Sequence, residues 1–261
     1  MPERLQGQLI LNTRPAHQQA ELSTLLEQEG AKILFFPVID IVARDSSVAR
    51  QRLTQQLSDY DILLFVSRNA VDHAFRYIDN TRFKPGVCFG VIGTATRSAL
   101  AQRVEQLDDC LLAGAPYNSE TLLEADALQQ VRGKRVLILR GQEGRNLLGD
   151  ELTTRGAAVD YCEVYQRELP RYAASEFNRL VEKAFPTLVL LTSNEGMHNL
   201  IELVDSRAAQ RLRRIPWLLI SERMRESALK LGHNASIIIA RSASDKGIQQ
   251  AIRDWADQLK P

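Results

Sequence analysis

Short apolar runs alternate with longer amphipathic segments along most of the chain. The runs are rich in Val, Ile and Leu and are bounded by polar residues, which is typical of buried β-strands. Between the first two runs, segment 17–30 places Leu22, Leu25 and Leu26 on one face of a helix. The predicted strands are residues 8–13, 31–36, 61–66, 87–92, 135–140, 159–164, 187–192, 216–221 and 236–241. This alternation predicts an α/β fold in which crossover helices connect parallel strands.

The pattern repeats once along the chain, at an offset of 126 residues (140 − 14 = 126). Three pairs of positions share this offset: Arg14 and Arg140 at strand ends, Gly30 and Gly156 at helix ends, and Ser67 and Ser193 at later strand ends. Segments 91–100 and 219–229 also correspond, after a small insertion that makes Ser221 the partner of Gly93. Several coincidences at one offset indicate that the chain consists of two related halves.

Two extended segments, 36–45 and 162–170, interrupt the alternation at equivalent places, since 165 − 39 = 126 pairs Ile39 with Tyr165. Each follows a strand directly with no helix between, which indicates a chain that leaves its sheet. We therefore expect two doubly wound, flavodoxin-like parallel-sheet domains joined by a ladder of two antiparallel crossing strands, about which the domains move. The expected ranges are 1–36 with 171–261 for the first domain, 43–163 for the second, and 37–42 and 164–170 for the crossing strands.

Composition narrows the possible partners. The formal net charge is +1, from 33 Lys and Arg against 32 Asp and Glu, so no global field recruits nucleic acid or an anionic membrane. The apolar runs are too short to span a bilayer, and the first residues show no signal-peptide core. Cys88, Cys110 and Cys162 are odd in number and lack CxxC spacing, so we expect a reduced, cytoplasmic protein.

Motifs for several kinds of chemistry are absent from the sequence. His17, His73, His198 and His233 are scattered without HxH or HExxH spacing, so no metal site is expected. Neither GxGxxG, nor a Walker loop, nor GxSxG occurs, which leaves nucleotide binding, phosphoryl transfer and serine hydrolysis without support. We expect no cofactor.

Candidate binding residues follow the predicted strands, because ligands of open parallel sheets bind beyond the carboxyl ends of the strands. Helix N-termini gathered around a space between two domains suit a ligand with several carboxylates. The candidates at these positions are Arg14, Ser67, Arg68, Asn69, Gly93, Thr94, Ala95, Thr96, Arg140, Gly141, Ser193, Asn194, Ser221 and Glu222.

Each candidate also has a purely structural interpretation. The three serines suit helix N-caps, which need no ligand. Arg14 and Arg140 either clamp an anion or pair with nearby acids at the surface. If the turn at Gly93 binds no ligand, the glycine is needed only for its backbone angles. If Tyr165 has no chemical role, its ring packs between the domains.

The order and spacing of eight segments resemble the uroporphyrinogen-III synthase family over the whole chain. The segments are TRP (13–15), PVIDI (37–41), VSRNAV (66–71), IGTATRSAL (92–100), LILRG (137–141), VYQR (164–167), LTSNEGM (191–197) and ISERMRESAL (220–229). The resemblance implies two α/β domains joined by a two-stranded ladder. It also implies a cofactor-free lyase that closes the linear tetrapyrrole hydroxymethylbilane with inversion of ring D and releases water. We expect a monomer that receives this substrate from hydroxymethylbilane synthase.

The resemblance assigns roles to individual residues. The family's tyrosine matches Tyr165, which is expected to assist departure of the substrate hydroxyl, since a phenol is protonated at neutral pH and can donate. The family's threonine matches Thr96. Backbone N–H groups are expected to hold the substrate carboxylates at 67–70, 93–96 and 193–196, which adds Ala70, Glu195 and Gly196 to the candidates. Where many members carry a glycine-and-threonine turn, this chain has 221–224, so only a backbone role is carried over to Ser221 and Glu222.

Two other functions share the predicted fold. A non-catalytic two-domain anion-binding protein also has two crossing strands, but such proteins are normally exported. A nucleotide- or flavin-dependent enzyme needs a glycine-rich loop after the first strand, and segment 12–19 has no glycine.

Overall fold

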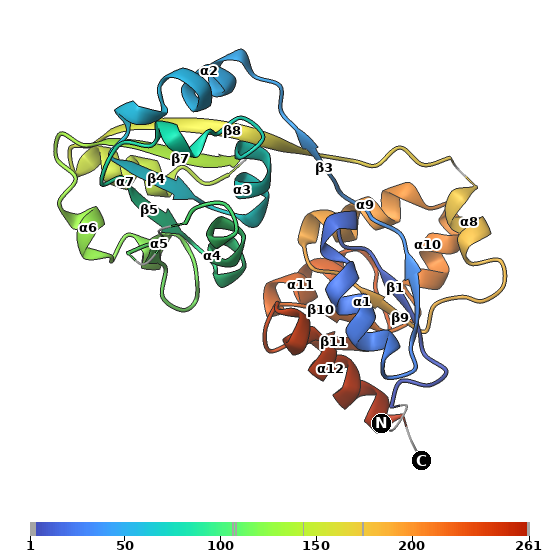
Figure 1. Ribbon diagram of the computed structural model, residues 1–261. Helices are drawn as coiled ribbons and strands as arrows, with labels where there is room; N and C mark the ends of the chain where they lie inside the picture. The colour runs from blue at the N-terminus through green and yellow to red at the C-terminus, as the bar shows by residue number, and fades with distance from the viewer. Residues whose placement is uncertain (1–3, 106, 108, 143, 174, 260–261) are drawn as a thin grey trace. The chain divides into compact units, whose positions relative to one another are not determined.

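The structure is a computed structural model that describes residues 4–105, 107, 109–142, 144–173 and 175–259 (Figure 1). It divides into two compact units. Unit 1 comprises residues 1–40 and 168–261, and unit 2 comprises residues 41–167. Each unit contains its own β-sheet, and the two are described separately below.

Unit 1 is built on a five-stranded sheet in the order β11-β10-β9-β1-β2. All four neighbouring pairs are parallel. The order 2-1-3-4-5, counted along the chain, is that of flavodoxin-like doubly wound folds. The strands are β1 (Leu9–Asn12), β2 (Lys32–Phe35), β9 (Leu188–Leu190), β10 (Trp217–Leu219) and β11 (Ile237–Ile239).

Helices cover both faces of this sheet. Helices α1 and α12 contact each other and share one buried cluster with Ile10, Leu190 and Leu218 of the strands. On the other face, Trp217 is fully buried and donates from Nε1 to the carbonyl of Leu212 at the end of α10, at 2.9 Å. The helical elements of unit 1 are η1 (Ala16–Gln18), α1 (Ala20–Glu27), α8 (Glu176–Leu180), α9 (Asn194–Leu203), α10 (Ser206–Leu212), α11 (Glu222–Lys230) and α12 (Asp245–Gln258).

Unit 2 contains a six-stranded sheet in the order β3-β8-β7-β4-β5-β6. The pairs from β8 to β6 are parallel. Its strands are β3 (Asp40–Ala43), β4 (Ile62–Phe65), β5 (Cys88–Val91), β6 (Leu111–Leu112), β7 (Arg135–Gly141) and β8 (Ala158–Glu168). The sequence pattern did not predict β6, because its two residues are too few to show a period.

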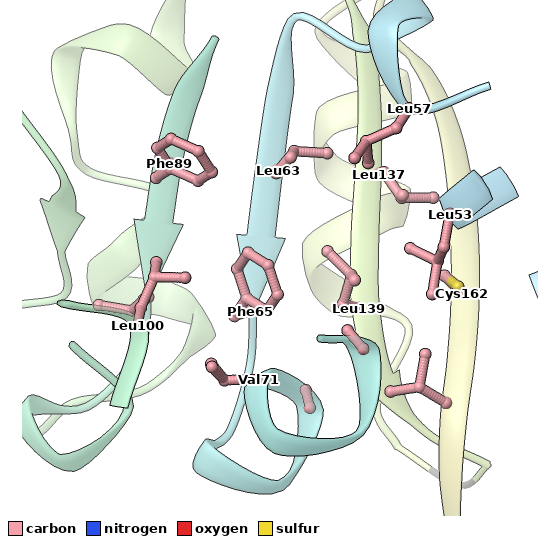
Figure 2. Close-up of a cluster of buried hydrophobic side chains, with 14 of the residues drawn as sticks. Leu53, Leu57, Leu63, Phe65, Val71, Phe89, Leu100, Leu137, Leu139 and Cys162 are labelled. Atoms are coloured by element: carbon pink, nitrogen blue, oxygen red, sulfur yellow. The ribbon is translucent and has the colours of Figure 1, made fainter. Parts of the chain in front are cut away.

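Both faces of the second sheet are also covered, which explains why its strands are apolar without interruption. Helices α2, α3 and α4 pack on the face that carries Leu63, Phe65 and Leu139 (Figure 2). Helices α5, α6 and α7 pack on the face that carries Ile62 and Ile138. The helical elements are α2 (Ser47–Gln55), η2 (Leu57–Asp59), α3 (Arg68–Ala74), η3 (Asn80–Arg82), α4 (Thr94–Ala101), α5 (Ser119–Leu122), α6 (Asp126–Gln129) and α7 (Leu147–Thr154).

The two sheets correspond strand by strand under the sequence offset. Reading β2-β1-β9-β10-β11 in unit 1 gives β8-β7-β4-β5-β6 in unit 2, and the first residues of β1 and β7 differ by 135 − 9 = 126. Gly30 and Gly156 both have left-handed backbone angles, φ +90° and +92°, where glycine is favoured. The prediction of two related α/β halves with parallel sheets is confirmed.

Strand β8 differs from the sequence interpretation, which divided it into a sheet strand and a crossing strand. It is one strand of 11 residues. Its pairing with β7 slips by one residue between Arg140 and Gly141, so that Arg140 lies opposite Glu163 but Gly141 lies opposite Tyr165. The bulge accommodates Val164 as an extra residue, and β8 continues to pair with β7 beyond it.

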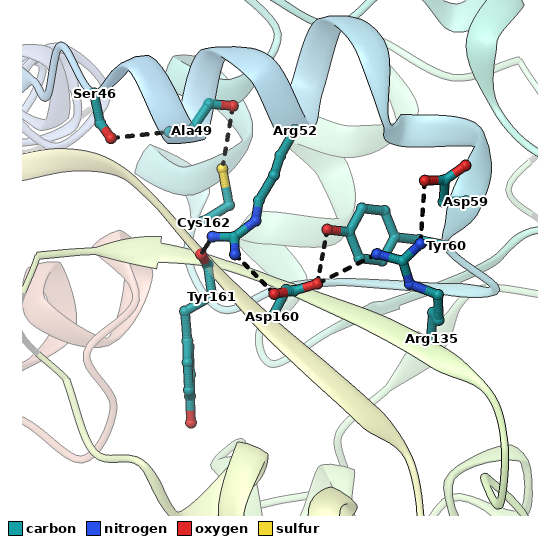
Figure 3. Close-up of polar contacts among 9 residues, drawn as sticks. All are labelled: Ser46, Ala49, Arg52, Asp59, Tyr60, Arg135, Asp160, Tyr161 and Cys162. Atoms are coloured by element: carbon teal, nitrogen blue, oxygen red, sulfur yellow. Dashed lines mark hydrogen bonds and ion pairs between the residues drawn. The ribbon is translucent and has the colours of Figure 1, made fainter.

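A charged network ties β8 to its surroundings in unit 2 (Figure 3). Asp160 accepts hydrogen bonds from Arg52 of α2 at 2.7 Å and from the Tyr60 hydroxyl at 3.0 Å. Arg135 of β7 pairs with the same carboxylate at 3.6 Å. Burial, followed by the bond to Asp160, raises the pKa of Tyr60 to about 12. The network therefore connects β8 to α2, to Tyr60 and to the neighbouring strand β7.

Candidate functional site

Tyr165 lies just beyond the bulge of β8 and belongs to the core of unit 2. Only 5% of the residue is exposed, and it shares one buried cluster with Cys162 and Val164. Strict alternation along a strand would place Tyr165 on the opposite face from these two residues. The one-residue slip therefore turns Tyr165 toward the face covered by α3 and α4.

The hydroxyl of Tyr165 meets the start of helix α3. It lies 3.1 Å from Ser67 Oγ, within hydrogen-bond distance. Ser67 is the N-cap of α3, and its Oγ also accepts a hydrogen bond from the backbone N–H of Ala70 at 3.1 Å. The sequence-based prediction of an N-cap at Ser67 is correct, and the cap has a second partner that the sequence did not reveal.

His73 is a further neighbour of Tyr165. Its ring centroid lies 5.7 Å from that of Tyr165, with the planes tilted by 34°, and 7% of the residue is exposed. The sequence analysis treated His73 only as one of four scattered histidines. Its position on the inward face of α3, in the same segment as Ser67, is the signal that could have placed it beside the site.

The turn at Gly93 forms the start of α4, which packs beside α3. Thr96 is buried with 4% exposed, whereas Thr94 and Ala95 are exposed. A Cβ atom at Gly93 would lie 3.9 Å from Thr96 Oγ1, which is an ordinary van der Waals contact, so the turn is not crowded at this position. Gly93 is the N-cap of this helix, and the turn places the backbone N–H groups of 94–96 at the helix start.

The arginines among the candidates all have acidic partners. Arg140 pairs with Glu163 at 3.2 Å and lies over the ring of Tyr161, with Cζ 3.9 Å from its centroid. Arg14 pairs with Asp245 at 2.6 Å. The exposed Arg68 approaches Asp72 at 3.6 Å. Of the two interpretations of Arg14 and Arg140, the ion pairs are the arrangement seen.

In unit 1 the corresponding strand ends carry two more capping serines. Ser193 accepts from the N–H of Gly196 at 2.9 Å, and Ser221 accepts from the N–H of Met224 at 3.4 Å. Asn194 Oδ1 is buried and has no hydrogen-bond partner within the described residues. Glu222 is exposed and pairs with Arg225 of its own helix at 2.6 Å.

The candidates thus form two sets, one in each unit. Unit 2 brings Tyr165, Gly141 and Ser67 into contact, with the rest of 67–70 following on α3. Unit 1 holds Arg14 and the segments 193–196 and 221–222. Tyr165 is buried in the core of unit 2, and its hydroxyl lies within hydrogen-bond distance of another candidate, Ser67.

Groups of three or more His, Cys, Asp or Glu side chains suited to a metal ion do not occur among the described residues. Within the same part of the chain, every helix is too short or too polar to cross a membrane.

Comparison with known proteins points to one family. A family model described as "Uroporphyrinogen-III synthase HemD" matches residues 20–249. The uroporphyrinogen-III synthase of Salmonella typhimurium is 34% identical over 249 residues, which cover 94% of this chain and 99% of that protein. The uroporphyrinogen-III synthase of Escherichia coli is 31% identical over 245 residues, with coverage of 94% and 99%.

A solved structure shows the same fold. The uroporphyrinogen-III synthetase of Helicobacter pylori matches with a TM-score of 0.63 at 15% identity, and the match covers 95% of this chain and 99% of that chain. At this identity the likeness concerns the fold alone, and it agrees with two α/β units built on parallel sheets.

Proposed function

The chain belongs to the uroporphyrinogen-III synthase family, whose enzymes act in tetrapyrrole biosynthesis, and we infer that it is a lyase that converts hydroxymethylbilane into uroporphyrinogen III. The observation that carries this inference is the family match over residues 20–249. The 34% identity to the Salmonella typhimurium protein, over nearly the full length of both chains, supports it independently.

The reaction begins with loss of the terminal hydroxyl of the substrate. The C–O bond breaks, the oxygen takes a proton and leaves as water, and ring A becomes an electrophilic azafulvene. Ring D attacks through its substituted carbon and forms a spirocyclic pyrrolenine, which fragments and recloses with ring D inverted. Because the open chain also closes directly to the symmetrical isomer, enforced folding of the substrate is the main task of the protein.

Tyr165 is proposed to donate the proton to the departing hydroxyl. Its ring is held by core packing and its hydroxyl by Ser67, with 5% of the residue exposed, so little reorganisation is needed before donation. Ser67 Oγ, 3.1 Å from the Tyr165 hydroxyl, provides a hydrogen-bond partner for the phenolic oxygen after the proton has been donated.

The carboxylates of the substrate are proposed to bind backbone N–H groups at 67–70, 93–96 and 193–196. This assignment is supported by the engagement of Arg14 and Arg140 with acidic side chains, at 2.6 and 3.2 Å, which reduces their availability to an anion. Thr96 is proposed to contribute its backbone N–H, because it lies in the first turn of α4, where N–H groups have no partner within the helix.

We further propose that the protein works as a cytoplasmic monomer that receives its substrate from hydroxymethylbilane synthase. The near-neutral net charge of +1 favours neither nucleic acid nor an anionic membrane as a competing partner.

The test is turnover of freshly generated hydroxymethylbilane, with separation of the product isomers by chromatography. Rapid formation of the type III isomer is expected. Binding of the substrate without acceleration, and with only the symmetrical type I isomer as product, would instead identify a non-catalytic anion-binding protein.

A further inference from the structure

Ser67 has more hydrogen-bonding capacity than helix capping uses. A serine hydroxyl provides one donor and two acceptor positions. One acceptor position receives the N–H of Ala70 at 3.1 Å. The donor is therefore available to the Tyr165 oxygen, which lies 3.1 Å away.

The direction of this bond decides what Tyr165 can do. When Ser67 donates to the Tyr165 oxygen, the phenolic proton points elsewhere and is free for transfer. The same bond then stabilises negative charge that develops on the phenolic oxygen as the proton leaves, and such charge-assisted bonds are the stronger kind. Within the described residues, Ser67 is the one hydrogen-bond partner of the Tyr165 hydroxyl.

The related half of the chain supplies an internal comparison. Ser193 caps α9 with nearly the same backbone angles as Ser67, φ −155° against −158°. The position equivalent to Tyr165 is Ile39 (165 − 126 = 39), whose Cδ1 lies 3.9 Å from a Cβ atom built at Gly196, beside the Ser193 cap. One half thus combines the cap with a phenol, and the other combines the same cap with an aliphatic side chain.

We propose that Ser67 is a positioning residue that orients the Tyr165 hydroxyl for proton donation. This inference rests on the proposed function. During loss of the substrate hydroxyl, the electron pair of the C–O bond goes to oxygen, which takes the Tyr165 proton and leaves as water. Ser67 donates to the resulting phenolate, which is reprotonated when ring D gives up a proton on regaining its aromaticity.

A double-mutant cycle tests this role, with single-turnover formation of the type III isomer as the measured rate. Ser67→Ala is expected to slow the reaction about three- to ten-fold, the effect of one hydrogen bond. In the Tyr165→Phe background, the same change is expected to alter the rate less than about two-fold, because the hydroxyl it orients is gone.

Two further variants separate positioning from capping. Ser193→Ala removes an equivalent cap, and its effect is expected to be the same in the wild-type and Tyr165→Phe backgrounds. Ser67→Thr keeps both the cap and the hydroxyl, so it should restore the rate to within about three-fold of wild type. Denaturation midpoints of all variants show whether each is folded.

The outcomes distinguish the separate claims. Equal effects of Ser67→Ala in both backgrounds would overturn the positioning role while leaving Tyr165 as donor. A wild-type rate for Tyr165→Phe would overturn both the donor role and the inference. Absence of the type III isomer with the wild-type protein would overturn the proposed activity itself.

Discussion

The ring of Tyr165 lies against the backbone of Gly141 on the neighbouring strand. A Cβ atom at Gly141 would lie 2.8 Å from two ring carbons and 3.1 Å from the hydroxyl oxygen of Tyr165. Such distances are below ordinary contact, so any larger residue at 141 must displace the ring. The glycine is thus required by the position of the phenol and not by an unusual backbone angle, since its φ is not in the left-handed region.

Gly141→Ala is therefore expected to reduce the rate of type III formation about as much as loss of the phenol does. It should also lower the free energy of unfolding by about 1–3 kcal/mol, as overpacking does. Gly144→Ala is the matched control, because the nearest atoms to its added Cβ lie 3.9 Å away, on the side chain of Arg140. Equal activity of the two variants would show that the ring position does not matter.

Tyr165→Phe keeps the ring in its packed position and removes only the hydroxyl. A positioned proton donor contributes about 10²–10⁴-fold, and the lower end is expected because the hydroxyl of the substrate is a labile leaving group. The fraction of type I isomer should rise, since spontaneous closure then competes. Single-turnover kinetics with isomer analysis measures both quantities, and circular dichroism checks folding. Thr96→Ala should cost less, because the backbone N–H groups of its turn remain.

Asp160→Ala is expected to lower the free energy of unfolding of unit 2 by about 1–2 kcal/mol, because Arg52 and the Tyr60 hydroxyl lose a shared partner. Asp45→Ala breaks the exposed pair with Arg50, and its effect should lie below about 0.5 kcal/mol. Urea titrations followed by far-UV circular dichroism compare the two. If both variants unfold at the same urea concentration, the Asp160 network contributes nothing measurable.

His233 should make unit 1 sensitive to acid. Burial lowers the pKa of this histidine, which stacks on Trp217 with ring centroids 4.3 Å apart. The folded state therefore disfavours the protonated form of His233. The contribution of neutral His233 to the free energy of unfolding is complete above the unfolded pKa of about 6.5, and it is lost as the pH falls toward the lower pKa of the folded state. Tryptophan fluorescence follows this unit, since Trp217 and Trp255 both lie in it.

The matched variant is His233→Phe, which keeps an aromatic ring on Trp217 and removes the titrating group. Its unfolding midpoint should change less between pH 7.5 and about pH 5.5 than that of the wild type. An identical pH dependence for the two proteins would assign the acid sensitivity to other groups.

The sequence predicted the features that depend on local pattern. The strands, the paired halves and the three serine caps follow from apolar period and polar strand ends, and the structure has all of them. Features set by distant partners were not predictable. Asp245, the partner of Arg14, lies 231 residues away.

The bulge in β8 is the clearest example of what the pattern misses. Its one-residue slip depends on how β7 and β8 pair, and neither strand shows it alone. Without the slip, Tyr165 would point to the other face, away from Ser67. The family resemblance identified the tyrosine, but only the pairing explains how its hydroxyl reaches the helix cap.

The position of β1 in its sheet determines the order in which the two units can be completed as the chain is synthesised. Strand β1 lies between β2 and β9, and Ile10 pairs with Leu188. All of residues 41–167 are made before that partner exists. A growing chain on the ribosome can therefore fold unit 2 first, while β1 is still without its neighbour β9. Residues 1–40 are translated before unit 2, but their sheet is completed only after unit 2 has been made.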